Sequence, residues 1–305
     1  MKPFLLAALL LAAVGPRAFA QMPHDPTATA APVGIFAGGV SGAADLVDPA
    51  HSVKFRTSGG GLYLHNSGWG SLTPAQKAAV LQTWRGSPVM IELGFGGTPA
   101  RARTWGEAYK SHYGDMGIHP AYIAANAFAG DNHPTPAQWT AYMAALRASG
   151  VPSTTIIMPT FEYQNFKDSI PTLLDNEVSK SAVFQALITS AGGIVLDTPS
   201  GYFFGREENY RTWVVDAIQW TRNHHLRCIV IVSPHSSKTH WDTDAARYLA
   251  YLHDHAALPT DFAVENYSTA GPGYPNPVGS EDAPNTALGV ALAYTRLLVP
   301  KTLPN

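Results

Sequence analysis

The stretches Gly193-Ile-Val-Leu-Asp197 and Cys228-Ile-Val-Ile-Val-Ser233 are both short, apolar and rich in β-branched residues, and each ends at a polar residue. Runs of this length, bounded by turn residues, are typical of strands buried on both faces. Between the two runs lies a helix-like segment that begins at Glu207-Glu-Asn-Tyr. This part of the chain therefore indicates a strand, a helix and a second strand in succession.

The same rhythm extends along most of the chain. Six further runs of strand character occur at Val33–Ala37, Leu62–His65, Val89–Leu93, Tyr122–Asn126, Thr154–Glu162 and Phe262–Glu265. Further helices are predicted to begin at Thr73-Pro-Ala-Gln, Thr135-Pro-Ala-Gln and Asp242-Thr-Asp, and a last one at about Pro284–Val299. A Thr N-cap followed by Pro at the first helical position is a strong helix start, because Pro fixes φ where no N–H is needed.

Eight strands, nearly all followed by a helical segment, predict an α/β fold of the (βα)₈ barrel type, in one domain over residues 33–305. The alternative is an open, doubly wound sheet. We favour the barrel because the strand count stops at eight and no glycine-rich dinucleotide fingerprint follows the first strand.

Composition excludes several classes of function. Hydrophobic residues make up 46% of the chain and charged residues only 14%, which indicates a packed globular protein. The net charge is −2 and no long run of basic residues occurs, so we expect no nucleic-acid partner. Cys228 is the only cysteine, which excludes an intrachain disulfide and any zinc site built from several cysteines.

The N-terminus predicts export. Lys2 precedes an apolar stretch from Phe4 to Val14, and Ala18-Phe-Ala20 fits the small-x-small rule for signal peptidase. We interpret residues 1–20 as a cleaved signal peptide and residues 21–32 as a flexible lead-in. Because Gly15-Pro-Arg17 interrupts the apolar stretch, it is too short for a membrane span, so a periplasmic or extracellular location is expected.

Three carboxylates end predicted strands: Glu162, Asp197 and Glu265. In a (βα)₈ barrel the chemistry lies at the C-terminal ends of the strands, and side-chain alternation puts Glu162 on the same side as Thr160 and Met158. Carboxylates partly desolvated at such a site acquire the shifted pKa values that acid–base catalysis needs. The alternative for each is a structural carboxylate that binds loop N–H groups or an arginine.

Other polar and aromatic residues are candidates for substrate binding. Glu92 lies inside a strand and would need a charged partner, for which Arg101 and Arg103 are candidates. Aromatic side chains offer flat apolar faces on which sugar rings stack. The remaining predicted substrate-binding residues are His65, Asn66, Trp69, Asn126, Tyr163, Tyr202, His235, Trp241 and Tyr267.

With its signal peptide, eight strands, acidic strand ends and aromatic rim, the chain resembles the broad group of secreted (βα)₈ glycoside hydrolases over residues 33–299. The resemblance implies a carbohydrate substrate, Glu162 as acid, Asp197 as nucleophile or base, and Glu265 assisting. The sequence departs from the commonest pattern of that group, since Ala127 rather than Glu follows Asn126 and the seventh strand ends with Ser233 and His235. The acidic run of chitinase-like barrels is also absent.

Three other interpretations stay open. The first is a non-catalytic barrel that binds a polysaccharide or a partner protein. The second is a phospholipase-C-like phosphodiesterase with His65 and His235 as acid and base and with carboxylates that hold a cation. The third is a serine hydrolase, based on Gly39-Val-Ser41-Gly-Ala43, which is a near miss to the nucleophile elbow. We expect no metal and no cofactor, because the pairs His224-His225 and His253-x-His255 do not share a helical face.

Overall fold

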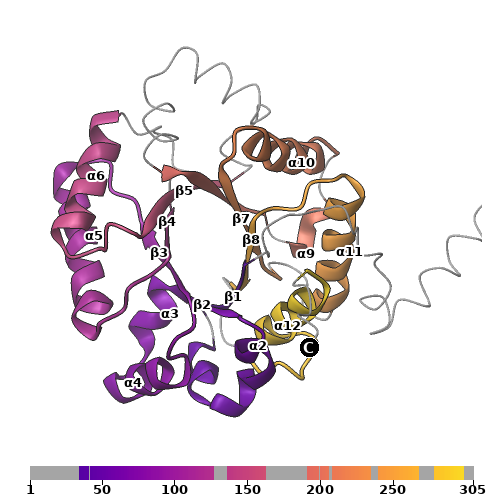
Figure 1. Cartoon of the computed structure of the whole chain (residues 1–305), viewed down its shortest axis with the longest axis horizontal. Helices are drawn as coiled ribbons and strands as arrows, with labels where there is room; N and C mark the ends of the chain where they lie inside the picture. Colours follow the sequence, from indigo (N-terminus) through magenta and orange to yellow (C-terminus); the bar gives the residue numbers. More distant parts are fainter. Residues whose placement is uncertain are drawn as a thin grey trace, which may run out of the picture.

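In the computed structural model, eight parallel strands close into a barrel in the order β1 to β8, and β8 pairs with β1 (Figure 1). The structure describes residues 34–40, 42–126, 136–162, 191–198, 200–205, 208–234, 240–267 and 278–298, and only the backbone of Pro136, Glu162, Gly201 and Tyr202. The strands are β1 Gly34–Gly39, β2 Gly61–His65, β3 Val89–Gly94, β4 Tyr122–Asn126, β5 Ile156–Glu162, β6 Gly193–Asp197, β7 Arg227–Val232 and β8 Asp261–Asn266.

The predicted (βα)₈ barrel is confirmed, and all eight strands lie within two residues of the predicted bounds. The open sheet is excluded because β1 and β8 are hydrogen-bonded along their length, with Gly38 opposite Glu265. The expected signal peptide and lead-in, residues 1–32, lie outside the described residues.

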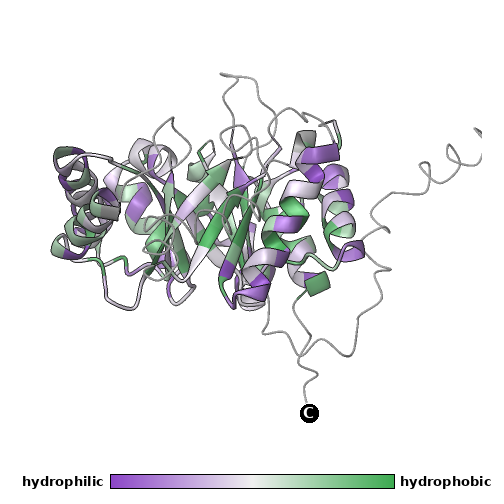
Figure 2. Cartoon of the chain, turned by 90° about the horizontal axis from the view of Figure 1, so that it is seen from above, coloured by the Kyte–Doolittle hydropathy of each residue, from purple (hydrophilic) through white to green (hydrophobic). Residues whose placement is uncertain are grey.

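Helices surround the strands (Figure 1). They are α2 Val53–Thr57, α3 Asn66–Ser71, α4 Pro74–Thr83, α5 Pro99–His112, α6 Pro136–Ala148, α9 Ser200–Phe203, α10 Glu208–Asn223, α11 Trp241–Asp254 and α12 Ala287–Leu298, with 3₁₀ turns at Ala43–Val47, Pro49–Ser52 and Gly114–Met116. Hydrophobic strands occupy the middle of the molecule and more hydrophilic helix surfaces its outside (Figure 2). Within the described ranges, no helix is both long and apolar enough to cross a membrane.

The predicted helix start at Thr73 forms a complete capping box. The Thr73 hydroxyl accepts a hydrogen bond from the Gln76 N–H, at 3.3 Å, and the Gln76 side chain accepts one from the Thr73 N–H, at 2.9 Å. Pro74 occupies the first position of α4. These contacts satisfy backbone donors that have no partner inside the helix.

Two apolar layers stabilise the barrel. The larger lies between strands and helices, and the smaller fills the barrel itself. The inner layer consists of Phe36, Tyr63, Met90, Tyr122, Ala124, Met158, Val195, Ile229, Ile231 and Ala263. Because side chains alternate along a strand, the residues two positions beyond these also point into the barrel, towards its C-terminal end. This alternation directs His65, Glu92, Thr160, Asp197 and Glu265 to the site described next.

The opposite end of the barrel is closed by an ion pair. Arg227 at the start of β7 lies 2.9 Å from the Asp261 carboxylate at the start of β8, and it also hydrogen-bonds the Tyr122 hydroxyl. The Asp261 side chain is 5% exposed. Arg227 thus gives the buried Asp261 carboxylate a charged partner.

Candidate active site

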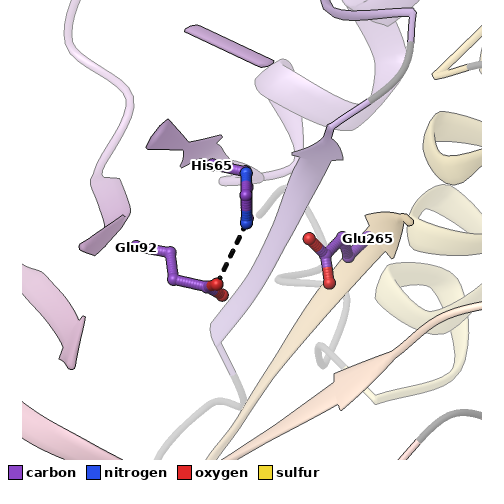
Figure 3. A group of neighbouring side chains, drawn as sticks. All are labelled: His65, Glu92 and Glu265. Carbon is purple, nitrogen blue, oxygen red and sulfur yellow. Dashed lines mark ion pairs between the residues drawn. The ribbon is translucent and has the colours of Figure 1, made fainter. Parts of the chain in front are cut away.

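Three ionisable side chains meet at the C-terminal end of the barrel: His65 from β2, Glu92 from β3 and Glu265 from β8. One ligand-type atom of each lies within 4.8 Å of the others, and Figure 3 shows the three groups pointing toward one another. Register explains the meeting, because His65 lies opposite Glu92 on the neighbouring strand. Gly38 separates Glu265 from β2, and a Cβ there would overlap the Tyr63 carbonyl oxygen, so the strands can approach closely only with glycine at this position.

The Glu92 carboxylate is held by three hydrogen-bonding groups. His65 Nε2 lies 3.1 Å from Oε1, Asn126 Nδ2 donates to the same oxygen, and the Tyr63 hydroxyl donates to Oε2. The residue is only 4% exposed. Glu92 is therefore a buried carboxylate whose two oxygens both accept hydrogen bonds, and its partner is His65, not the predicted Arg101 or Arg103, which are exposed on α5.

The hydrogen bonds of His65 define its tautomer. Its Nδ1 accepts the backbone N–H of Ser67, at 3.1 Å, where the chain turns into α3. A neutral imidazole that accepts at Nδ1 carries its proton on Nε2. His65 therefore donates to Glu92, which explains how a β2 residue stabilises the charge of a β3 residue.

The pKa of Glu92 is lowered. Burial is the largest influence and raises it, but the hydrogen bonds from His65, Tyr63 and Asn126 lower it by more. The pKa of the Tyr63 hydroxyl is raised well above its ordinary value, mainly by burial and then by the charges of Glu265 and Glu92. Tyr63 therefore stays protonated and remains a donor, while Glu92 is ionised at neutral pH.

The pKa of Glu265 shifts in the opposite direction to that of Glu92. Glu265 is also 4% exposed, but its Oε1 has no hydrogen-bond partner among the described residues. Burial raises its pKa well above the ordinary value, and the negative charges of Glu92 and Asp197 raise it further. The pKa values of two neighbouring carboxyl groups are therefore shifted in opposite directions, which favours the ionised form of Glu92 and the protonated form of Glu265.

The same three side chains are also the described group whose ligand atoms lie close enough together to hold a metal ion. A cation bound at His65 Nε2 would need a lone pair there, but Nδ1 already accepts the Ser67 N–H. Because a neutral imidazole has one acceptor nitrogen, metal binding would require loss of that hydrogen bond. The observed hydrogen bonds suit proton transfer better than metal ligation.

The register places the other two predicted carboxylates side by side. Glu162 at the end of β5 lies opposite Asp197 at the end of β6. Asp197 is half-buried and its charge acts on both Glu265 and Tyr63. The Glu162 side chain is outside the described residues, so its role as acid stays a prediction.

The structure places some of the predicted substrate-binding residues at the site and others away from it. Asn126 contacts Glu92, and the Tyr267 ring lies 6.5 Å from that of His65. Asn66 bonds the imidazole of His112 instead of facing Glu92. The indoles of Trp69 and Trp241 are fully buried in the outer apolar layer, so their faces are not available to a sugar. Tyr163, His235 and the side chain of Tyr202 lie outside the described residues.

Two residues at the site were not singled out as functional from the sequence. Tyr63 lies in an apolar run, which predicts a core residue, although it shares an inward face with His65. Thr160 shares its side with Met158, as alternation predicted, but its hydroxyl gave no separate signal. In both cases the register across strands, which the sequence does not give, brings the residue to the site.

No known protein family and no curated protein matches the sequence. Solved structures do match at low identity. The glycoside hydrolase domain of PgaB (BpsB) from Bordetella bronchiseptica is 11% identical, with 88% of this chain and 99% of that chain covered and a TM-score of 0.45. The phosphoribosyl anthranilate isomerase of Thermococcus kodakaraensis is 11% identical, with 88% of this chain and 98% of that chain covered and a TM-score of 0.47. The GH99 endo-alpha-mannosidase of Bacteroides thetaiotaomicron is 15% identical, with 82% of this chain and 84% of that chain covered and a TM-score of 0.45. These likenesses concern the barrel fold.

Proposed function

We propose that this protein is an exported glycoside hydrolase that uses Glu92 and Glu265 as its carboxylate pair. The observation that carries the proposal is that two facing, buried carboxyl groups differ in their hydrogen bonds, which shifts their pKa values in opposite directions. Hydrolysis of a glycosidic bond needs one carboxylic acid and one carboxylate on either side of the scissile bond. Glu265 fits the first role and Glu92 the second.

We assign the roles from the directions of the two pKa shifts. Glu265 donates its proton to the glycosidic oxygen as the bond from that oxygen to the anomeric carbon breaks, and the Glu92 carboxylate attacks that carbon to form a glycosyl ester. Glu265, now ionised, then takes a proton from water as the water oxygen bonds to the anomeric carbon and Glu92 leaves as a carboxylate. Each group returns to its starting state, which is the general scheme for retention.

The spacing of the pair favours retention over inversion. A carboxyl oxygen of Glu92 and one of Glu265 lie within 4.8 Å of each other. Retaining glycosidases separate their carboxyl groups by about 5–5.5 Å, whereas inverting ones leave about 6.5–9.5 Å for a water molecule. We therefore expect a product with the anomeric configuration of the substrate.

Sugar as the substrate class is supported by the surroundings of the pair. Tyr267 lies beside His65 at the site, and aromatic side chains are the kind on which sugars stack. The barrel opens for chemistry at the C-terminal ends of the strands, where the pair lies. The predicted signal peptide is consistent with a substrate outside the cytoplasm.

The test is product release from a panel of bacterial and plant polysaccharides. We expect release by the wild-type protein and its loss in both Glu92→Gln and Glu265→Gln. Glu107→Gln removes an exposed carboxylate on α5 and should retain full activity. If Glu162→Gln and Asp197→Asn abolish release while the first two variants remain active, the catalytic pair is the one predicted from the sequence. Binding without product by folded wild-type protein would indicate a non-catalytic barrel.

A further inference from the structure

Two polar atoms on inward positions of the strands have no hydrogen-bond partner among the described residues. They are Glu265 Oε1 and the hydroxyl of Thr160 on β5. Thr160 is 1% exposed, so bulk water does not satisfy its hydroxyl. Buried polar side chains are almost always hydrogen-bonded, and an exception at a functional site points to a partner that is not part of the chain.

The strand register places Thr160 beside Asn126, which hydrogen-bonds the candidate catalytic Glu92. Ala124 on β4 lies opposite Met158 on β5, so two positions further along, Asn126 and Thr160 are neighbours. Asn126 donates to Glu92 from the other side. Glu92, Asn126 and Thr160 thus project inward from three successive strands, and Met158 forms the apolar floor below Thr160.

A second threonine shows that the fold can satisfy such a hydroxyl. Thr155, just before β5, is 2% exposed, and its hydroxyl donates to the Pro120 carbonyl oxygen at 2.6 Å. Burial of a hydroxyl without a partner destabilises the folded state, whereas burial with one does not. The two threonines are almost equally buried, but only the Thr155 hydroxyl has a partner among the described residues. We take this to indicate that the Thr160 hydroxyl forms its hydrogen bond with a bound molecule.

We propose that the Thr160 hydroxyl is a specificity-determining contact for one hydroxyl of the sugar unit bound at the C-terminal end of the barrel. A threonine hydroxyl both donates and accepts, which matches a sugar hydroxyl, and it carries no charge to stabilise an ionic ligand. The proposal rests on the proposed function for the position of this sugar, whose glycosidic bond lies between Glu92 and Glu265.

The test is calorimetric titration of the full-length protein with D-glucose, D-galactose, D-mannose and N-acetyl-D-glucosamine. For the sugar that the wild type binds best, Thr160→Val should weaken binding about tenfold, because it keeps the shape and removes one hydrogen bond. Thr160→Ser keeps the hydroxyl and should bind within about twofold of wild type. One monodeoxy derivative should bind the wild type about tenfold more weakly than the parent, and Thr160→Val should bind both equally.

Thermal unfolding separates the contact from a structural role. Without sugar, Thr160→Val should melt at the wild-type temperature or above, because the valine leaves no unpaired hydroxyl, whereas Thr155→Val should melt lower and still bind sugar. If no sugar binds the wild type, or if Thr160→Val binds every sugar as well as the wild type does, the inference is wrong. Sugar binding that depends on Thr160, without cleavage of any polysaccharide, would refute the proposed hydrolase and leave the contact standing.

Discussion

The carboxyl groups of Glu92 and Glu265 are equally buried and face each other from β3 and β8, yet their pKa values shift in opposite directions. Burial raises both values. The difference comes from hydrogen bonds, since Glu92 accepts from Tyr63, His65 and Asn126, while one oxygen of Glu265 has no described partner. The fold thus separates an acid from a base by the placement of donors rather than by depth.

The first prediction concerns the pH profile of kcat/KM, which should be bell-shaped. Activity requires ionised Glu92, so it falls as pH drops below the pKa of Glu92, which lies under the ordinary 4.5. It also requires protonated Glu265, so it falls as pH rises through the raised pKa of Glu265. Glu265→Gln should lower kcat/KM by about 10²–10⁴-fold and remove the alkaline limb. An alkaline limb that persists in this variant would assign it to another group.

The second prediction isolates the donor to Glu92. Tyr63→Phe removes one hydrogen bond to the ionised carboxylate, so the pKa of Glu92 should rise and the acid limb should move about one unit to higher pH. Tyr109→Phe is the matched control, because its hydroxyl bonds the Ile118 carbonyl oxygen away from the site. The control should be less stable than the wild type, and the acid limb of its pH profile should stay at the wild-type pH. If both variants show the wild-type limb, Tyr63 does not hold Glu92.

The third prediction links Glu265 to stability. Below about pH 4.5 the carboxyl is protonated in both folded and unfolded chains. As pH rises, the unfolded chain loses this proton while the folded chain keeps it, so folding loses stability until the pH reaches the raised pKa of Glu265. Glu265→Gln escapes this loss. Its melting temperature relative to wild type should therefore increase between pH 4 and pH 8, by about 2–4 °C for each kcal/mol. A constant difference would show that Glu265 titrates normally.

The fourth prediction concerns the ion pair at the opposite end of the barrel. Arg227→Met leaves the Asp261 carboxylate buried without its charged partner and should destabilise the protein by roughly 2 kcal/mol, less than for a fully buried pair because Arg227 is 40% exposed. Asp261→Asn in the same chain should recover part of this loss in denaturant titrations. The pH profile of activity should not change, and a change would mean that this end of the barrel takes part in the reaction.

The strands were predictable because each is a short apolar run that ends at a turn or a polar residue, and Glu265 was identified as a strand-end carboxylate. The contacts between strands could not be predicted from the sequence. The sequence offers Arg101 and Arg103 as candidate partners of Glu92, but both lie on the exposed side of α5, and the strand register supplies His65 instead. Trp69 and Trp241 are predicted from the sequence to bind substrate, but Trp69 lies in α3 and Trp241 begins α11, and these helices bury both indoles against the barrel.

The most direct test of the account is product release from the polysaccharide panel by wild type, Glu92→Gln and Glu265→Gln, with the anomeric configuration of the product followed by NMR. We predict release by wild type, a product that retains the configuration of the substrate, and loss of release in both variants while Glu107→Gln remains active. Full release by either variant, or an inverted product, would contradict the assignment of Glu92 and Glu265 as the reacting pair.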